Sequence, residues 1–235
     1  MNVLYQLEPE KEYCVSVEQG EEKAEISFCT EAQDYTVNVR DFGARGDGVQ
    51  DDTLYIQAAI MACPKDSRVL IPEGVYRITS LFLKDHLTLE LAKGAVLSAD
   101  TQREKFPILK GTCQNEEKGK EYILGTWEGD ACDMFSGIIT GIGVKDVTIY
   151  GEGIIDGNAS WENWWFEAKK IRIAARPRMI FLNRCENVQI VGITVQNSSE
   201  LEYSSVFSRH LKFIGVTVLG PKDSPKYRRF KSRIL

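Results

Sequence analysis

The chain has 235 residues, of which 43% are hydrophobic, with 19 glycines and 7 prolines. This composition is that of a globular protein with one sizeable core, and it excludes intrinsic disorder. Its formal net charge is −5, and without the five basic side chains of its last ten residues the remainder carries 24 basic against 34 acidic groups. An acidic body disfavours nucleic-acid binding, because neutralising phosphates needs a basic face.

Nothing in the sequence predicts export or membrane insertion. The N-terminus MNVLYQLEPEKEY has no basic segment followed by an apolar run, and no window approaches the roughly 18 apolar residues of a membrane span. The six cysteines form no CxxC pair, so neither a zinc site nor a disulfide scaffold is predicted. Scattered thiols without an export signal predict a cytoplasmic protein, provided that Met1 is the true start.

Residues 1–33 contain the alternating stretch CVSVEQGEEKAEISFCT, which predicts two strands joined by a turn at Gly20. The spacing of Leu7, Pro9 and Tyr13 resembles the tyrosine corner of fibronectin type III domains, whose phenol hydroxyl bonds to backbone just upstream. Such a sandwich needs about seven strands, and about two are visible here. We interpret residues 1–33 as a partial fibronectin type III-like β-segment, with a plain leading hairpin as the alternative.

A helix is predicted from about 52 to 63. Apolar residues such as Ile56 and Ile60 recur at helical spacing, and Asp51 or Asp52 can cap its start. These paired aspartates are also conceivable catalytic carboxylates, but capping explains them more simply. The glycines before the helix lack the Lys-Ser/Thr of a phosphate loop, so phosphate binding is not predicted.

From residue 68 the pattern becomes periodic, with a polar pair, a short alternating strand, a glycine-containing bend and a second short strand in each unit. The units are DHLTLELAKGAVLSA (85–99), KDVTIYGEGIIDG (145–157), ENVQIVGITVQNS (186–198) and RHLKFIGVTVLG (209–220). The equivalent positions Val188 and Leu211 lie 23 residues apart. A repeat of this kind is typical of a solenoid, and the short strands predict a right-handed parallel β-helix with the helix covering one end.

Residues 101–134 interrupt this rhythm, being charged and glycine-containing with little alternation. Long insertions between coils lie on the surface and often form the walls of a binding groove. A solvated loop without a role in binding is the alternative.

Two parts of the sequence resemble known families. VNVRDFGARGDGVQDDTLYIQAAI with VLIPEGVYRITSLFLKDHLTLELAKGAVLSA is similar to the opening of pectin-lyase-like β-helices, including polysaccharide lyases and phage tailspikes. GEGIIDGNASWENWWF with RPRMIFLNRCENVQIVGITVQNS resembles family 28 of the glycoside hydrolases, the polygalacturonases. The resemblance covers about residues 37 to 220 and implies that residues 37–235 form the N-terminal part of an all-β, right-handed parallel β-helix.

The resemblance implies inverting hydrolysis of α-1,4-galacturonosyl bonds in pectin or oligogalacturonides, without a metal or another cofactor. An inverting glycosidase holds two carboxyl groups about 6.5 to 9.5 Å apart, one as the acid and one as the base. Two alternatives stay open, which are a polysaccharide lyase on the same fold and a non-catalytic carbohydrate-binding β-helix. No nucleic acid or membrane is expected as a partner.

Aromatic and basic residues of the family-like region are candidate substrate contacts. Trp161, Trp164 and Trp165 can stack on sugar rings, and plugging one side of a coil is the alternative role. Arg176 and Arg178 can hold a substrate carboxylate in a bidentate manner, with ordinary surface pairing as the alternative. We predict Trp164, Trp165, Arg176 and Arg178 as substrate-binding residues.

No catalytic residue is predicted in the chain as it stands. The family takes its carboxylates from an Asn-Thr-Asp motif and a later Asp-Asp pair, followed by Gly-His-Gly and Arg-x-Lys, and none of these is present. The Asn-Thr-Asp motif is expected after the sequence DSP, where the chain has Lys226, Tyr227 and Arg228. Asp156 in IIDG is interpreted as a turn residue rather than an acid catalyst.

A one-base change of reading frame accounts for the missing motif. Codons that encode KYRRFKSRIL (226–235) give Asn-Thr-Asp-Gly-Leu-Asn-Pro-Glu-Ser when one A is removed. Codons for SELEYSS (199–205) likewise give Pro-Ser-Trp-Asn-Ile-His-Pro, which matches a Pro-x-Trp-x-x-His pattern of the family. We therefore predict that residues 226–235 are a frame-shifted tail and that this chain is truncated before its catalytic motifs and inactive.

Overall fold

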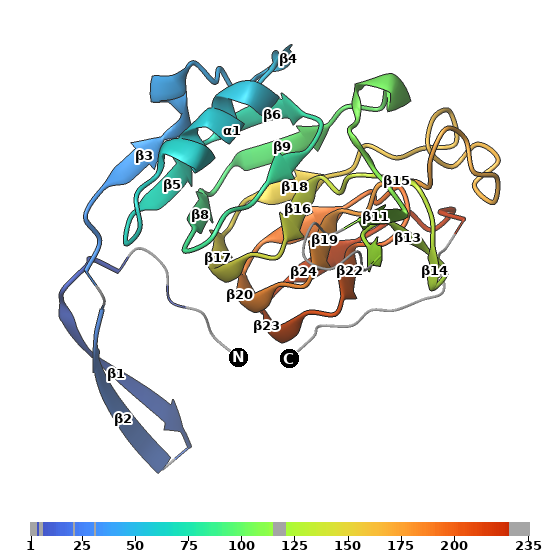
Figure 1. Ribbon diagram of the computed structural model, residues 1–235. Helices are drawn as coiled ribbons and strands as arrows, with labels where there is room; N and C mark the ends of the chain where they lie inside the picture. Colours follow the sequence, from blue (N-terminus) through green and yellow to red (C-terminus); the bar gives the residue numbers. More distant parts are fainter. Residues whose placement is uncertain (1–3, 5–6, 21, 31, 115–120, 226–235) are drawn as a thin grey trace.

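The fold is a solenoid of parallel strands, seen in a computed structural model (Figure 1) that describes residues 4, 7–20, 22–30, 32–114 and 121–225. The predicted tail at 226–235, with Lys226, Tyr227 and Arg228, lies outside the described residues. In Figure 1 the coils stack from α1 and β4 at one end to β22, β23 and β24 at the other, and the β1–β2 hairpin projects away from the stack.

Three parallel sheets run along the solenoid. The first contains β3 (Thr36–Asn38), β5 (Arg68–Ile71), β8 (Thr88–Leu91), β17 (Lys145–Gly151), β20 (Glu186–Val191) and β23 (Arg209–Ile214), in that spatial order. The second contains β4 (Asp47–Asp51), β6 (Gly74–Ile78), β9 (Ala95–Ala99), β18 (Ile154–Asp156), β21 (Thr194–Gln196) and β24 (Thr217–Leu219). The third contains β7 (Leu81–Phe82), β16 (Ile139–Ile142), β19 (Ile180–Asn183) and β22 (Tyr203–Val206).

The strand register confirms the repeat predicted from the sequence. Val147 pairs with Val188, and Val188 pairs with Leu211, so equivalent apolar positions lie directly above one another. The core therefore consists of inward-facing stacks, of which Leu89, Ile149 and Ile190 are fully buried members. Each coil buries its apolar face against the coils above and below it, as expected of a solenoid.

Gly151 shows why the bend between the first and second sheets needs glycine. Its φ is +126°, a conformation that residues with a side chain rarely adopt, and a Cβ built on it would lie 2.0 Å from the Leu91 carbonyl oxygen. The backbone of neighbouring coils therefore approaches more closely here than any side chain permits.

The predicted helix is α1 (Thr53–Ala62), which follows a 3-10 turn, η1 (Val39–Phe42), and buries Ile56 and Ile60 at the first coils. Its capping differs from a simple Asp52 cap. Asp52 occupies the N-cap position, but its buried carboxylate accepts from the N–H groups of the preceding loop, at 2.9 Å from Arg45 and 3.0 Å from Gly46. Asp51 instead accepts from the Thr53 N–H at 3.0 Å. Both aspartates thus hold backbone in place.

The predicted N-terminal strands form an antiparallel hairpin of β1 (Glu12–Gln19) and β2 (Glu22–Cys29). The Glu8 N–H donates to the Tyr13 hydroxyl at 2.8 Å, which is the contact with upstream backbone that the tyrosine-corner interpretation anticipates. The assignment of residues 1–33 to a partial fibronectin type III-like domain stays a prediction.

Candidate functional site

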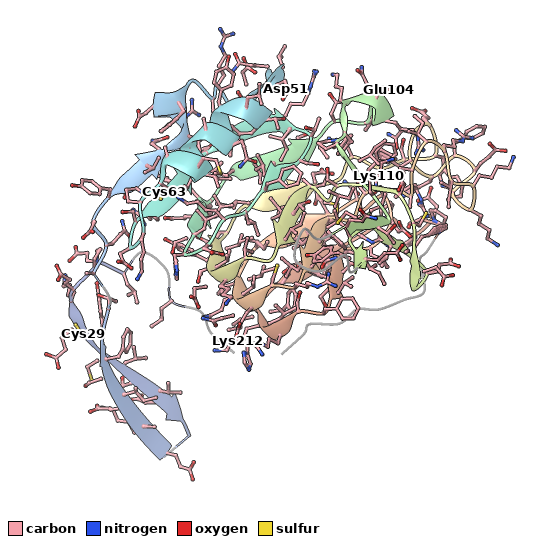
Figure 2. The ribbon with its side chains drawn as sticks, in the orientation of Figure 1. Cys29, Asp51, Cys63, Glu104, Lys110 and Lys212 are labelled. Carbon is pink, nitrogen blue, oxygen red and sulfur yellow. The ribbon has the colours of Figure 1, made fainter. Side chains whose placement is uncertain are left out.

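The loops that connect the second sheet to the third emerge one above another, and we call them the loop edge. They are residues 79–80, 100–138, 157–179 and 197–202, and residues 220–225 begin the next one. The position predicted for the catalytic motif, 226–228, comes next in the sequence and lies outside the described residues. In Figure 1 the two long loops extend to the right, and Figure 2 places Glu104 and Lys110 on that side.

The insertion at 101–134 covers the outer face of the third sheet. It contains η2 (Arg103–Lys105) and the antiparallel pairs β10 (Ile108–Leu109) with β15 (Met134–Phe135), β11 (Thr112–Gln114) with β12 (Glu121–Ile123), and β13 (Thr126–Trp127) with β14 (Asp130–Ala131). Leu109 and Met134 pack on Phe181 of β19 in a second apolar cluster. The insertion is therefore a packed part of the loop edge.

Trp164 and Trp165 lie in the interior. Trp164 is 1% exposed, and its ring meets Phe106 and Phe135 edge to face at centroid distances of 5.5 and 5.8 Å. Trp165 is 3% exposed and donates its indole N–H to the Ser198 carbonyl at 3.1 Å. The predicted substrate contact therefore needs correction, because neither indole face is open; both rings plug the coil, which was the alternative.

Trp161 is the indole of this loop that faces solvent. It is 49% exposed, packs edge to face on Trp165 at 6.2 Å, and donates its N–H to the Asp223 carbonyl at 3.1 Å. Asp223 lies just before the predicted catalytic position. Trp161 thus offers a fixed, partly open aromatic face at the loop edge, of the kind on which a sugar ring stacks.

Arg176 and Arg178 are also buried, at 6% and 3% exposure. Arg176 donates to the Ser199 carbonyl and Arg178 to the Thr126 carbonyl, the latter at 2.6 Å. Burial lowers the pKa of both guanidinium groups, and the neighbouring Glu200 carboxylate opposes that shift. The prediction that they bind substrate directly is corrected here, because they tie neighbouring loops together from within.

Arg103 and Arg172 are partly exposed arginines of the edge that the sequence analysis did not select. The Arg103 guanidinium lies 4.3 Å from the centre of the Trp164 ring. Burial lowers the pKa of Arg103, and the positive charges of Arg172 and Arg176 lower it further. Arg103 therefore lies on one indole with two other guanidinium groups near enough to affect its pKa, and Arg172 itself pairs with Glu167. The signal was present in the sequence, because residues 157–179 contain five basic and two acidic side chains in a chain of net charge −5.

Asp156 holds the turn, as interpreted from the sequence. Its carboxylate accepts from Gln196 Nε2 at 2.7 Å, from Asn197 Nδ2 at 2.9 Å and from the Asn158 N–H at 2.8 Å. These bonds link successive coils at the start of the loop edge.

Within the described ranges, no group of three or more His, Cys, Asp or Glu side chains is placed to hold a metal ion. A search of the same residues for a helix long and apolar enough to cross a membrane finds none.

The stacked parallel sheets, the end-covering helix and the long loops on one edge define a right-handed parallel β-helix of the pectin-lyase type. The exopolygalacturonase of family 28 from Yersinia enterocolitica has this fold, with a TM-score of 0.69 and 24% identity over 91% of this chain and 45% of that one.

A family model described as Rhamnogalacturonase A/epimerase, pectate lyase-like matches residues 36–224, and the chain belongs to that family. A probable polygalacturonase of Vitis vinifera is 29% identical over 199 residues, which are 81% of this chain and 38% of the relative. An exo-poly-alpha-D-galacturonosidase of Dickeya chrysanthemi is 31% identical over 134 residues, 57% of this chain and 21% of the relative. The protein is thus polygalacturonase-like, as the sequence resemblance predicts, and spans less than half the length of either relative.

Proposed function

We propose that the protein is of the polygalacturonase type, whose reaction is inverting hydrolysis of α-1,4-galacturonosyl bonds, and that this chain retains the binding of polygalacturonate or oligogalacturonides. The observation that supports this best is the Arg103 guanidinium over the Trp164 ring, with Arg172 and Arg176 near enough to lower its pKa. Glu167 already pairs with Arg172, so a bound carboxylate would chiefly relieve the repulsion at Arg103. An acidic polysaccharide fits this edge better than a neutral one.

Each part of the loop edge has a matching part in such a substrate. Arg103 and Arg172 present guanidinium groups, which bind carboxylates through parallel N–H bonds. Trp161 presents a partly open aromatic ring from the same loop as Arg172. Hydrogen bonds to charged groups contribute about 1.5 to 3 kcal/mol each, so the loss of one guanidinium should weaken binding about tenfold or more.

The catalytic step needs carboxylates that the predicted position lacks. Lys226, Tyr227 and Arg228 stand where the family has Asn-Thr-Asp, and none of them supplies a carboxylate for general acid or base catalysis. We therefore expect the chain to bind oligogalacturonide without hydrolysing it. That expectation also keeps the non-catalytic carbohydrate-binding β-helix as the second candidate.

Binding is tested by titrating the protein with tetragalacturonate in a calorimeter. Arg103→Gln and Arg172→Gln should each weaken binding about tenfold or more, and Trp161→Ala should weaken it as well. Arg209→Gln is the matched control, because it removes the same charge from an exposed side chain that pairs with Glu186 on the first sheet. Equal affinity of Arg103→Gln and Arg209→Gln would show that the loop edge is not the binding site.

Turnover is tested on the same samples. Release of reducing ends would contradict the prediction that this chain is inactive, and an ultraviolet-absorbing unsaturated product would identify a lyase instead. Absence of any binding to tetragalacturonate would count against the proposed substrate class itself.

The reading-frame prediction is tested by sequencing the coding DNA at the codons for residues 199–205 and 226–228. A single-base difference from related genes at both places is expected. An intact frame shared with those genes would refute the explanation, and residues 199–205 and 226–235 would then be the native ones.

A further inference from the structure

A polar groove of about 420 Å³ lies on the outer face of the first sheet. It is lined by residues of β5, β8, β17 and β20, by Ala32 and Gln33, and by residues of the loop before and the turn between these strands, at 65–67 and 86. In Figure 1 these strands run down the left side of the solenoid, whereas the long loops of the loop edge extend to the right. We call this feature the first-sheet groove.

The floor of the groove is a row of side chains in register on neighbouring strands. Thr88 of β8 pairs with Thr148 of β17, and Thr148 pairs with Gln189 of β20. Neighbouring strands lie about 4.8 Å apart, so the row spans roughly 10 Å, on the scale of a disaccharide. None of these three side chains forms a hydrogen bond with another part of the described chain. Their hydroxyl and amide groups are available to a ligand.

The neighbouring row is held rigid by contacts among its own members. His86 Nδ1 lies 3.3 Å from Asp146 Oδ2, and Asn187 Nδ2 donates to Asp146 Oδ1 at 2.7 Å. These three residues share a left-handed backbone, with φ of +54°, +55° and +54°, so the turn repeats in each coil. A ligand therefore meets a wall whose side chains are already positioned, which lowers the entropic cost of binding.

The groove has no net positive charge to attract a carboxylate. Lys65 and Arg68 contribute two positive charges and Asp66 and Asp146 two negative charges, and Arg68 is already paired with Glu90 at 2.7 Å. The groove therefore differs from the cationic loop edge, because a uronate carboxylate bound here would face the two aspartates. Hydroxyl groups, which both donate and accept, suit a surface of hydroxyls, amides and paired charges.

We propose that the first-sheet groove binds an uncharged oligosaccharide, at a site separate from the loop edge. The chemical class follows from the unpaired floor of Thr88, Thr148 and Gln189 and from the absence of net positive charge among the described side chains that line it. No Phe, Tyr or Trp is among the described residues that line the groove, so the affinity rests on hydrogen bonds exchanged with water and should lie in the millimolar range. Such a site would hold a neutral segment of a mixed polysaccharide while the loop edge holds an acidic one.

The test is a titration of the isotopically labelled protein with galactotetraose, followed by nuclear magnetic resonance. The methyl resonance of Thr148 and the side-chain amide of Gln189 should shift in a saturable manner. The double variant T148V/Q189L should lose at least about tenfold in affinity, because it keeps the side-chain volumes while removing the polar groups. Thr194→Val is the matched control, since this threonine faces outward from the second sheet.

Each outcome decides the proposal. Saturable shifts in the unmodified protein, lost in T148V/Q189L and retained in Thr194→Val at unchanged melting temperature, support it. Absence of shifts at Thr148 and Gln189 in the unmodified protein overturns it even if the double variant does not fold. Tighter binding of tetragalacturonate than of galactotetraose in the groove overturns it too. Arg103→Gln should leave galactotetraose binding unchanged, so the proposal for the groove and the proposal for the loop edge are tested independently.

Discussion

Replacing Tyr203 by phenylalanine is expected to stabilise the protein. Tyr203 lies in β22, where it pairs with Ile180 of the coil below, and its ring packs edge to face on Phe213 at 4.7 Å. Its hydroxyl oxygen is buried and has no hydrogen-bond partner among the described residues. Tyr203→Phe keeps the ring and its contacts and removes only that hydroxyl.

The size of the effect follows from the cost of an unpaired polar group. A buried hydroxyl without a partner costs about 1 to 3 kcal/mol relative to one bonded to water. The variant should gain a comparable amount, and for a chain of this size each kcal/mol raises the melting temperature by about 2 to 4 °C. Tyr203→Ala is the opposing control, because it removes the ring as well and should destabilise the protein by several kcal/mol, roughly 3 to 5 as for other buried aromatic rings.

The assay is urea unfolding of the variants, followed by fluorescence and by circular dichroism to check that both probes report one transition. A free energy of unfolding for Tyr203→Phe equal to or below that of the unmodified protein would refute the reasoning, because the hydroxyl would then have a partner or be solvated. Burial raises the pKa of the Tyr203 phenol. The folded state therefore favours the neutral phenol. The contribution of this raised pKa to the free energy of unfolding is fully present below the unfolded pKa of about 10 and is lost as pH rises through the folded value.

Two further substitutions test the packing of the coils, and a third tests the pH dependence of stability. Gly151→Ala should destabilise the protein by at least about 1 to 3 kcal/mol, the cost of a strained backbone, with a steric clash in addition; Gly220→Ala, where a Cβ meets nothing within 4 Å, should be close to neutral, as thermal melts will show. Trp164→Ala should cost about 3 to 5 kcal/mol in urea unfolding. Burial raises the pKa of Asp100, but the hydrogen bond from Lys105 and other positive contacts outweigh it and leave the pKa lowered. Since a lowered folded pKa stabilises above the unfolded value near 3.9, that contribution disappears as pH falls, and Asp100→Asn should flatten the acid side of the stability profile.

The sequence predicted those strands that alternate between core and solvent. In β8 and β9 every second residue is buried, and this period identified both strands in each coil. The third sheet was not identified, because β19 is buried along its whole length between the solenoid core and the insertion. A strand covered on both faces has no alternation to detect.

The candidate site was predicted in location but not in its individual residues. The tryptophans and arginines of residues 157–179 do belong to the loop edge, but Trp164 and Arg178 point inward while Trp161 and Arg172 remain accessible. These residues lie within a single loop and differ little in composition from one another. Direction in an irregular loop depends on contacts with distant segments, such as the Ser198 carbonyl that binds Trp165.

The sequence by itself determined the solenoid, its 23-residue step, the helix at one end and the resemblance to polygalacturonases, because these depend on repeated local patterns that each coil carries in its own residues. Only the tertiary structure decided which cations of the loop edge are accessible, that the insertion covers the third sheet, and that Thr88, Thr148 and Gln189 form one polar row. Residues far apart in the chain become neighbours through the stacking of coils, and insertions of unequal length between the coils hide that alignment from the sequence.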